Sequence, residues 1–66
     1  MKNRIRVARA EVRMTQQQLA DATGVSRQTI NAIESGKFVP STILALKIAA
    51  TFGQAVEEIF QLEDGD

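Results

Sequence analysis

The chain has 66 residues, with eight basic and eight acidic side chains. This length supports one hydrophobic core at most, so we expect a single domain over residues 1–66. It contains neither cysteine nor histidine, which excludes disulfides, thiolate metal sites and the usual general base, so we expect no catalytic residue, no metal site and no cofactor. No apolar run is long enough to cross a bilayer and no secretory signal pattern opens the chain, so a cytoplasmic protein without a membrane partner is expected.

The first segment with helical spacing runs from about Arg4 to Arg13. Its apolar residues Ile5, Ala8 and Val12 recur at the spacing that places side chains on one face of a helix. We therefore expect a first helix here, with that face buried.

The next segment is typical of two short helices joined by a tight turn. Thr15 followed by Gln18 forms a capping-box pattern, which predicts a second helix that ends at Gly24, a residue suited to the left-handed position after a helix. Ser26 is the expected N-cap of a third helix, which Gly36 closes. The residues expected to be buried in these two helices are Leu19, Ala20, Ile30 and Ile33.

The last third of the chain predicts two further helices. Pro40-Ser41 precedes a fourth helix over Thr42–Phe52, and a short fifth helix is expected over Val56–Phe60. Their expected buried residues are Leu44, Ile48, Ala49, Phe52, Val56, Ile59 and Phe60. Only the two ends, Lys2–Arg4 and Gln61–Glu63, could pair as short edge strands. The expected fold class is therefore all-α: a five-helix bundle with a helix-turn-helix. Short β-strands at the two ends are possible in addition.

The stretch from about 15 to 36 carries the functional information. Its turn, Thr23 to Ser26, is so short that the two helices must cross steeply, as they do in a helix-turn-helix. On the third helix, about 26–35, the side opposite the buried isoleucines carries Arg27, Gln28, Asn31, Ala32 and Ser35. Amides suit adenine and a guanidinium suits guanine or a phosphate, so this slim polar face predicts a recognition helix for the major groove of double-stranded DNA. A plain solvated helix face is the alternative, and the flanking turn and caps favour the DNA interpretation.

Charge is distributed unevenly along the chain. Up to Pro40, seven basic residues stand against three acidic ones, whereas from Ser41 onward a single lysine stands against five acidic residues. A separation of this kind lets one part of a protein face phosphates while the other part faces away.

These segments resemble, in order and at matching spacing, the phage-repressor (Cro/C1-type, Xre) family of helix-turn-helix regulators. The matching segments are Thr15–Ala20, Gly24–Ile30, Ile33–Gly36, Pro40-Ser41 and Leu46–Ala49, within a likeness from about Ile5 to Phe60. The resemblance implies a phosphate contact from Gln16, base contacts from Gln28 and Asn31, and a contact of Arg27 with either a base or the backbone. It also implies that Arg9 and Glu34 pair between the first and third helices, so neither is expected to contact DNA or to act in catalysis.

Further DNA contacts are expected around the recognition helix. Ser26 lies at its start, and Ser35 and Lys37 at its end could clamp a phosphate strand, although a plain surface lysine is an equal alternative at position 37. The chain departs from the family pattern at Ala32, where alanine could touch only a thymine methyl. It also departs at Gln54-Ala55, which replaces the usual cap of the last helix.

One recognition helix makes too few base contacts to select a genomic site. We therefore expect a homodimer that reads a palindromic operator with half-sites roughly 34 Å apart. Apolar residues of the C-terminal half could form its interface, or they could complete the core; they are Phe38, Val39, Ile43, Leu46, Ala50 and Leu62.

The predicted function is transcription regulation, first as a repressor that excludes polymerase, with activation by contact with RNA polymerase left open. An antitoxin or restriction–modification controller on the same fold is a first alternative. A protein-interaction module that no longer binds DNA is a second, favoured by the zero net charge. An enzyme is the least expected class.

Overall fold

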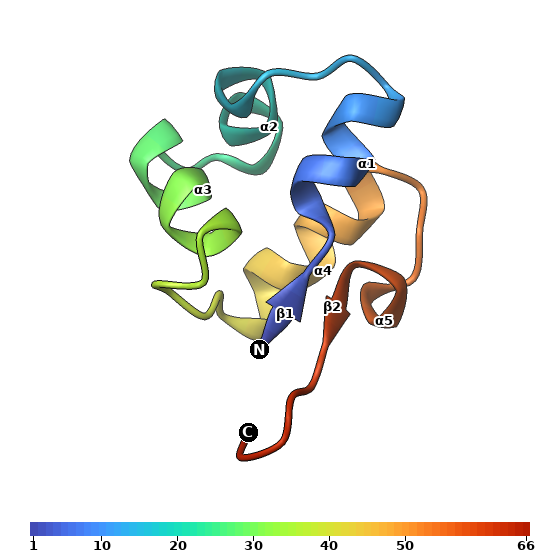
Figure 1. Cartoon of the computed structure of the whole chain (residues 1–66). Coiled ribbons are helices and arrows are strands. Elements are labelled where there is room, and N and C mark those ends of the chain that lie inside the picture. Colours follow the sequence, from blue (N-terminus) through green and yellow to red (C-terminus); the bar gives the residue numbers. More distant parts are fainter.

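The computed structural model describes residues 1–66 as five helices and a small antiparallel sheet that joins the two ends of the chain (Figure 1). The elements are β1 (Lys2–Asn3), α1 (Ile5–Glu11), α2 (Gln16–Thr23), α3 (Arg27–Glu34), α4 (Thr42–Thr51), α5 (Val56–Ile59) and β2 (Phe60–Gln61). α2 packs against both α3 and α4, and α4 packs against α5. The predicted five-helix fold is therefore confirmed, and the terminal strands are present.

Every helix contributes to one small core. Its six fully buried large side chains are Ile5, Leu19, Ile30, Ile33, Ile48 and Ile59. Burying a side chain of this size stabilises a fold by about 1.5–3 kcal/mol. Because the six come from all five helices, no helix hides its apolar face alone, and the helices hold one another in place.

The end of α1 differs from the expectation. The helix stops at Glu11 rather than near position 13, and Val12, which we expected to be buried, is 55% exposed. Arg13 takes the left-handed conformation, with a φ of 55°, and its N–H donates to the carbonyl of Ala10. The N–H of Met14 reaches back to the carbonyl of Arg9 at 2.9 Å, which completes a Schellman motif and turns Met14, instead of Val12, onto the core.

The caps of α2, α3 and α4 agree with their predicted residues. Thr15 and Gln18 form the reciprocal capping box of α2, and Ser26 and Ser41 accept from backbone N–H groups in the first turns of α3 and α4. Gly24, which directly follows α2, and Gly36, which follows the C-cap Ser35 of α3, adopt positive φ angles of 76° and 78°. These helix boundaries follow from local chemistry, which is why single residue types were sufficient to predict them.

The last elements lie slightly earlier in the chain than expected. Phe60 belongs to β2 rather than to the fifth helix, and it pairs with Asn3 in an extended conformation. α5 has no side-chain cap at Ala55, but the carboxylate of Glu58 accepts from the Ala55 N–H at 3.0 Å and takes over part of that role.

Most apolar residues of the C-terminal half that we singled out remain outside the core. Their exposed fractions are 50% for Phe38, 63% for Val39, 68% for Ile43, 53% for Leu46 and 79% for Leu62. The alternative that they complete the core is therefore wrong.

None of the five helices has the length and the apolar character that a membrane-spanning helix needs.

Gly53, which ends α4, provides a test of how far backbone conformation decides a helix end. Its φ is +65°, and an added Cβ would meet no atom within 4 Å, so the cost of Gly53→Ala lies in the backbone alone. We expect the free energy of unfolding to fall by about 1 kcal/mol in urea denaturation. Gly65→Ala, at an equally open left-handed position in the C-terminal tail, is the matched control and should change it by less than about 0.5 kcal/mol. Equal effects of the two substitutions would contradict this account.

Candidate nucleic-acid interface

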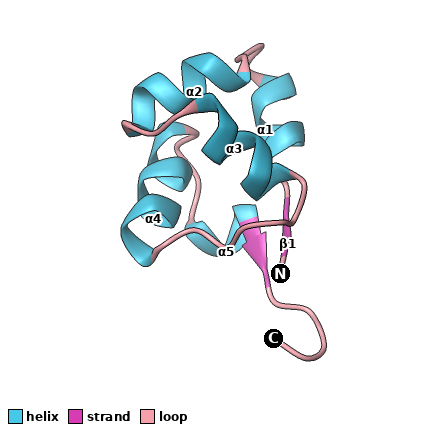
Figure 2. Ribbon diagram, turned by 90° about the vertical axis from the view of Figure 1, so that its left-hand side faces the viewer, coloured by secondary structure: helices cyan, strands magenta, loops and turns pink.

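α3 presents one uncovered face on a helix that is held firmly from behind. Ile30 and Ile33 anchor the helix in the core, with 0% and 1% of their surface exposed. In Figure 2 no other element lies in front of α3. The exposed polar residues of this face are Arg27, Gln28, Asn31 and Ser35. The structure thus brings the predicted recognition residues together on one side of one helix.

The predicted site residues differ in how many hydrogen-bonding groups remain free. The side chains of Arg27, Gln28 and Lys37 make no hydrogen bond or ion pair within the chain. Ser26 is occupied by capping, because its hydroxyl oxygen accepts from the Thr29 N–H at 3.2 Å. The hydroxyl of Ser35 donates to the carbonyl of Ala32. Among these five residues, the free donors therefore lie at both ends of α3 and at position 28.

Gln16, at the start of α2, reaches across to α3. Its Nε2 atom donates to Oδ1 of Asn31 at 3.2 Å and to Oε2 of Glu34 at 3.0 Å. Both side-chain donors are thus used inside the protein, so the phosphate contact predicted for this residue would have to come from its backbone N–H at the open N-terminus of α2. The same bond leaves Nδ2 of Asn31 free to donate outward.

Beneath this face lies the ion pair between Arg9 and Glu34, which confirms the predicted pairing of α1 with α3. Nε of Arg9 donates to Oε1 of Glu34, and Nη2 donates to Oε2 at 3.2 Å. The Glu34 side chain is only 1% exposed. Nη1 of Arg9 also donates to the carbonyl of Met14, so one guanidinium holds both α3 and the loop between α1 and α2.

The surroundings of Glu34 keep it ionised. Burial by itself raises the pKa of this carboxyl, but hydrogen bonds from Arg9 and Gln16, together with the charges of Arg9 and Arg6, outweigh burial and hold the pKa below its usual value of 4.5. An ionised carboxylate can only accept hydrogen bonds. The amide of Gln16 must therefore point its NH₂ group toward Glu34, which fixes the orientation of Gln16.

The positions of two residues beside α3 were not predicted from the sequence. Nδ2 of Asn3, in β1, donates to the carbonyl of Ile33 at 2.9 Å and so ties the N-terminal strand to the end of α3. Phe38, which we placed among the interface candidates, lines a hollow of about 290 Å³ beside α3 together with Gln28, Thr29 and Ala32. No local pattern signals the contact of Asn3, because its partner lies 30 residues away.

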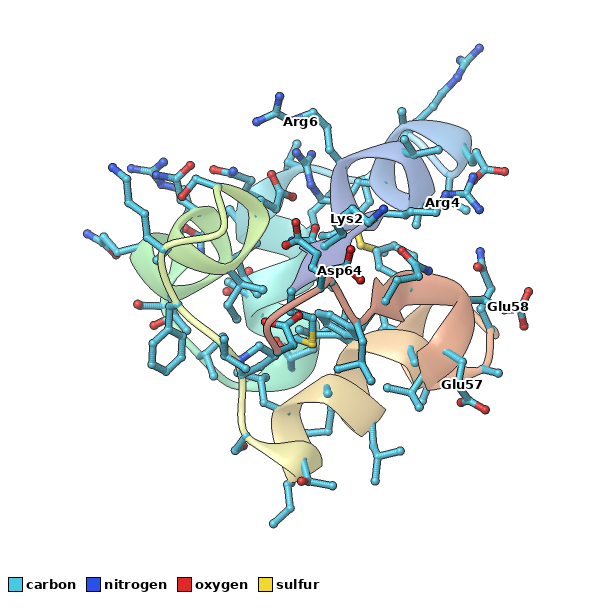
Figure 3. All side chains as sticks on the ribbon, turned by 60° about the horizontal axis from the view of Figure 1, so that its bottom comes forward. Lys2, Arg4, Arg6, Glu57, Glu58 and Asp64 are labelled. Atoms are coloured by element: carbon cyan, nitrogen blue, oxygen red, sulfur yellow. The ribbon has the colours of Figure 1, made fainter.

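The predicted separation of charge is only partly realised. Figure 3 shows Arg6 projecting from α1, and Glu57 and Glu58 projecting from α5 on another side of the molecule. At the joined chain ends the charges offset one another locally, because the amino group of Met1 lies 3.0 Å from Glu63 and 3.1 Å from Asp66. The acidic tail is thus folded onto the N-terminus, whereas Arg27 and Lys37 remain unpaired on and beside α3.

Comparisons with known proteins agree with this geometry. The family model described as Helix-turn-helix matches residues 5–59. The chain is 53% identical over 66 residues to a protein of Methanocaldococcus jannaschii named as an uncharacterized HTH-type transcriptional regulator, and covers 100% of both chains. It is 45% identical over 64 residues to YgzD of Bacillus subtilis, which is named in the same way, and covers 97% of each.

A solved structure is also similar to the whole arrangement. The crystal structure of the restriction-modification controller protein C.AhdI from Aeromonas hydrophila superposes with a TM-score of 0.80. The two chains are 28% identical, and the match covers 86% of each. The arrangement of helices around α3 is therefore shared with a controller protein.

The ion pair under α3 can be tested through its pH dependence. Glu34→Gln should lower the free energy of unfolding at about pH 7 by roughly 2–3 kcal/mol, because Arg9 loses a charged partner in a buried position. Since folding lowers the pKa of Glu34, its contribution is fully present above about pH 4.5 and is lost as the pH falls through the lower native pKa. In urea denaturation, the difference between the wild type and the variant should therefore shrink toward about pH 3.

Glu57→Gln is the matched control, because Glu57 is exposed on α5. It should leave the acid dependence of stability unchanged. If Glu34→Gln retained the full acid dependence of the wild type, another group would have to be responsible.

Proposed function

The chain belongs to the helix-turn-helix family of transcriptional regulators, and from this premise we propose that it binds a palindromic double-stranded DNA operator as a homodimer, with α3 in the major groove. It acts first as a repressor, by occupying DNA that polymerase needs. No residue is assigned a catalytic role.

The observation that carries the proposal is the contrast between the two sides of α3. One side is buried on Ile30 and Ile33 and is held by the Arg9–Glu34 ion pair. The other side exposes Gln28 and Arg27 with no partner in the protein. Binding costs less when the groups that bind are already ordered, so a rigid helix with unused polar groups suits recognition of base edges.

Five of the predicted contact residues have a role in this proposal. Gln28 reads a base edge through both its donor and its acceptor, and Asn31 reads a neighbouring edge through Nδ2 while Gln16 holds its Oδ1. Arg27, at the positive N-terminus of α3, binds a guanine edge or a phosphate. Lys37 binds a phosphate beyond the other end of the helix. Gln16 thus acts both on phosphate and as a positioning residue for Asn31.

Dimerisation is supported by the composition of α4. Apart from Lys47 and its two terminal threonines, this helix carries only apolar side chains, with Ile48 and Ala49 in the core and Ile43, Leu46 and Ala50 exposed on the outside. We refer to the last three, which share one face at helical spacing, as the α4 stripe. A helix with so few polar residues is normally buried on most of its sides. Binding to a palindromic site requires a second copy of the chain, and that copy would cover the α4 stripe.

A second candidate function follows from the structural likeness to C.AhdI, a restriction-modification controller protein. In this second function α3 of the chain binds DNA through the same face, and the regulated genes belong to a restriction–modification system. RNA polymerase is then a partner of the DNA-bound dimer if the protein activates as well as represses.

The recognition helix is tested by selection from random duplex DNA, followed by affinity measurements at fixed salt. We expect an enriched palindrome with half-sites about one turn apart. Gln28→Ala and Asn31→Ala should each weaken binding to this operator by about 10- to 100-fold per half-site, because each removes one base contact.

Gln54→Ala is the matched control for these variants. Gln54 lies in the loop that joins α4 to α5, which Figure 1 shows on the side of the molecule away from α3. This variant should bind the operator as the wild type does. Unchanged specificity in the two α3 variants would mean that another surface reads the DNA.

The dimer is tested by placing a charge in the α4 stripe. Leu46→Glu should raise the dissociation constant of the dimer by at least about 30-fold, as expected for loss of a central apolar anchor. Sedimentation equilibrium measures this change. Val12→Glu, which places the same charge at an exposed apolar residue outside α4, is the control and should leave the dimer intact. A variant with Leu46→Glu that remained dimeric would place the interface elsewhere.

A further inference from the structure

Beside the polar face of α3 lies a feature that hydrogen bonding to bases does not explain. The hollow of about 290 Å³ is lined by Gln28, Thr29, Ala32 and Phe38, and we refer to it as the Phe38 hollow. Phe38 lies just after the turn that ends α3, and 50% of its surface is exposed. Phe38 thus exposes half of its aromatic side chain next to Gln28, the proposed base-reading residue. Such a surface is suited to bind an apolar group.

The chemistry of the lining narrows the choice of ligand. No charged residue lines the hollow, so it lacks a cationic group for a phosphate. The hydroxyl of Thr29 is within 3.0 Å of the Ser26 hydroxyl at the cap of α3, so its polar group is already satisfied. Ala32 offers only a methyl group. The hollow therefore presents apolar surface, bordered on one side by the free amide of Gln28.

In the major groove, the one apolar group that a base pair presents is the C5-methyl group of thymine. Gln28 and Ala32 are one helical turn apart, about 6 Å along α3, which corresponds to one or two base-pair steps. With α3 in the groove, the base edge that meets Ala32 and Phe38 therefore lies within two steps of the base that Gln28 reads.

We propose that the Phe38 hollow binds the C5-methyl group of a pyrimidine, which is thymine in unmodified DNA, and that Ala32 and Phe38 thereby determine one base of each half-site. This inference rests on the proposed function, because it requires α3 in the major groove. It assigns to Phe38 a role in the selection of DNA sequence, whereas the sequence analysis had placed Phe38 among the candidates for the dimer interface.

The test removes only the methyl group. In the selected operator, each thymine is replaced in turn by deoxyuridine, and the affinity is measured at fixed salt. At one position in each half-site, this replacement should weaken binding by about threefold to fivefold, the effect of one buried methyl group. Cytosine at the same position should bind more weakly than 5-methylcytosine by a similar factor.

The variant Phe38→Ala should lose this discrimination, binding the thymine and deoxyuridine operators equally. Val7→Ala, at an exposed apolar residue of α1, is the control and should retain it. Operators that are insensitive to deoxyuridine at every position would overturn the inference while leaving the proposed function standing. So would a Phe38→Ala variant that binds all DNA sequences more weakly by one factor, since Phe38 would then contact the sugar–phosphate backbone. Failure to select any operator would overturn both.

Discussion

The carboxylate of Glu34 is the point on which the arrangement of the first three helices depends. It lies in the protein interior and receives three hydrogen bonds, two from Arg9 on α1 and one from Gln16 on α2. A buried charge is tolerated only when it is fully paired, so these three residues can be satisfied in one relative placement of α1, α2 and α3. Arg9 extends the constraint to the loop before α2 through the carbonyl of Met14.

This constraint explains how a small protein can hold a helix rigidly and still leave one of its faces free. The core has only six large, fully buried side chains, which is little for fixing five helices. The polar cluster around Glu34 and the bond from Asn3 to the end of α3 add directional contacts where apolar packing is thin. The α4 stripe and the Phe38 hollow remain uncovered, and both are surfaces where a partner would complete the burial.

The helix ends show most clearly what local rules can and cannot predict. α3 and α4 end in Schellman motifs with Gly36 and Gly53 in the left-handed position, and both glycines mark the ends in the sequence. α1 ends in the same motif with Arg13 in that position, and an arginine gives no such signal. The expected burial of Val12 was wrong for this reason. The expected first helix ended near Arg13, whereas α1 ends at Glu11, so Val12 lies beyond the helical face that is buried.

The sequence by itself determined the helix class, the caps at Thr15, Ser26 and Ser41, and the polar face of α3, because each depends on residues within one or two turns of one another. The pairing of Arg9 with Glu34 came from family resemblance rather than from local chemistry. Only the tertiary structure decided that Gln16 turns its amide inward, that Asn3 supports α3, and that Phe38 lies beside α3. These contacts join residues that different helices and strands bring together, and their geometry depends on how the whole core packs, which no local pattern encodes.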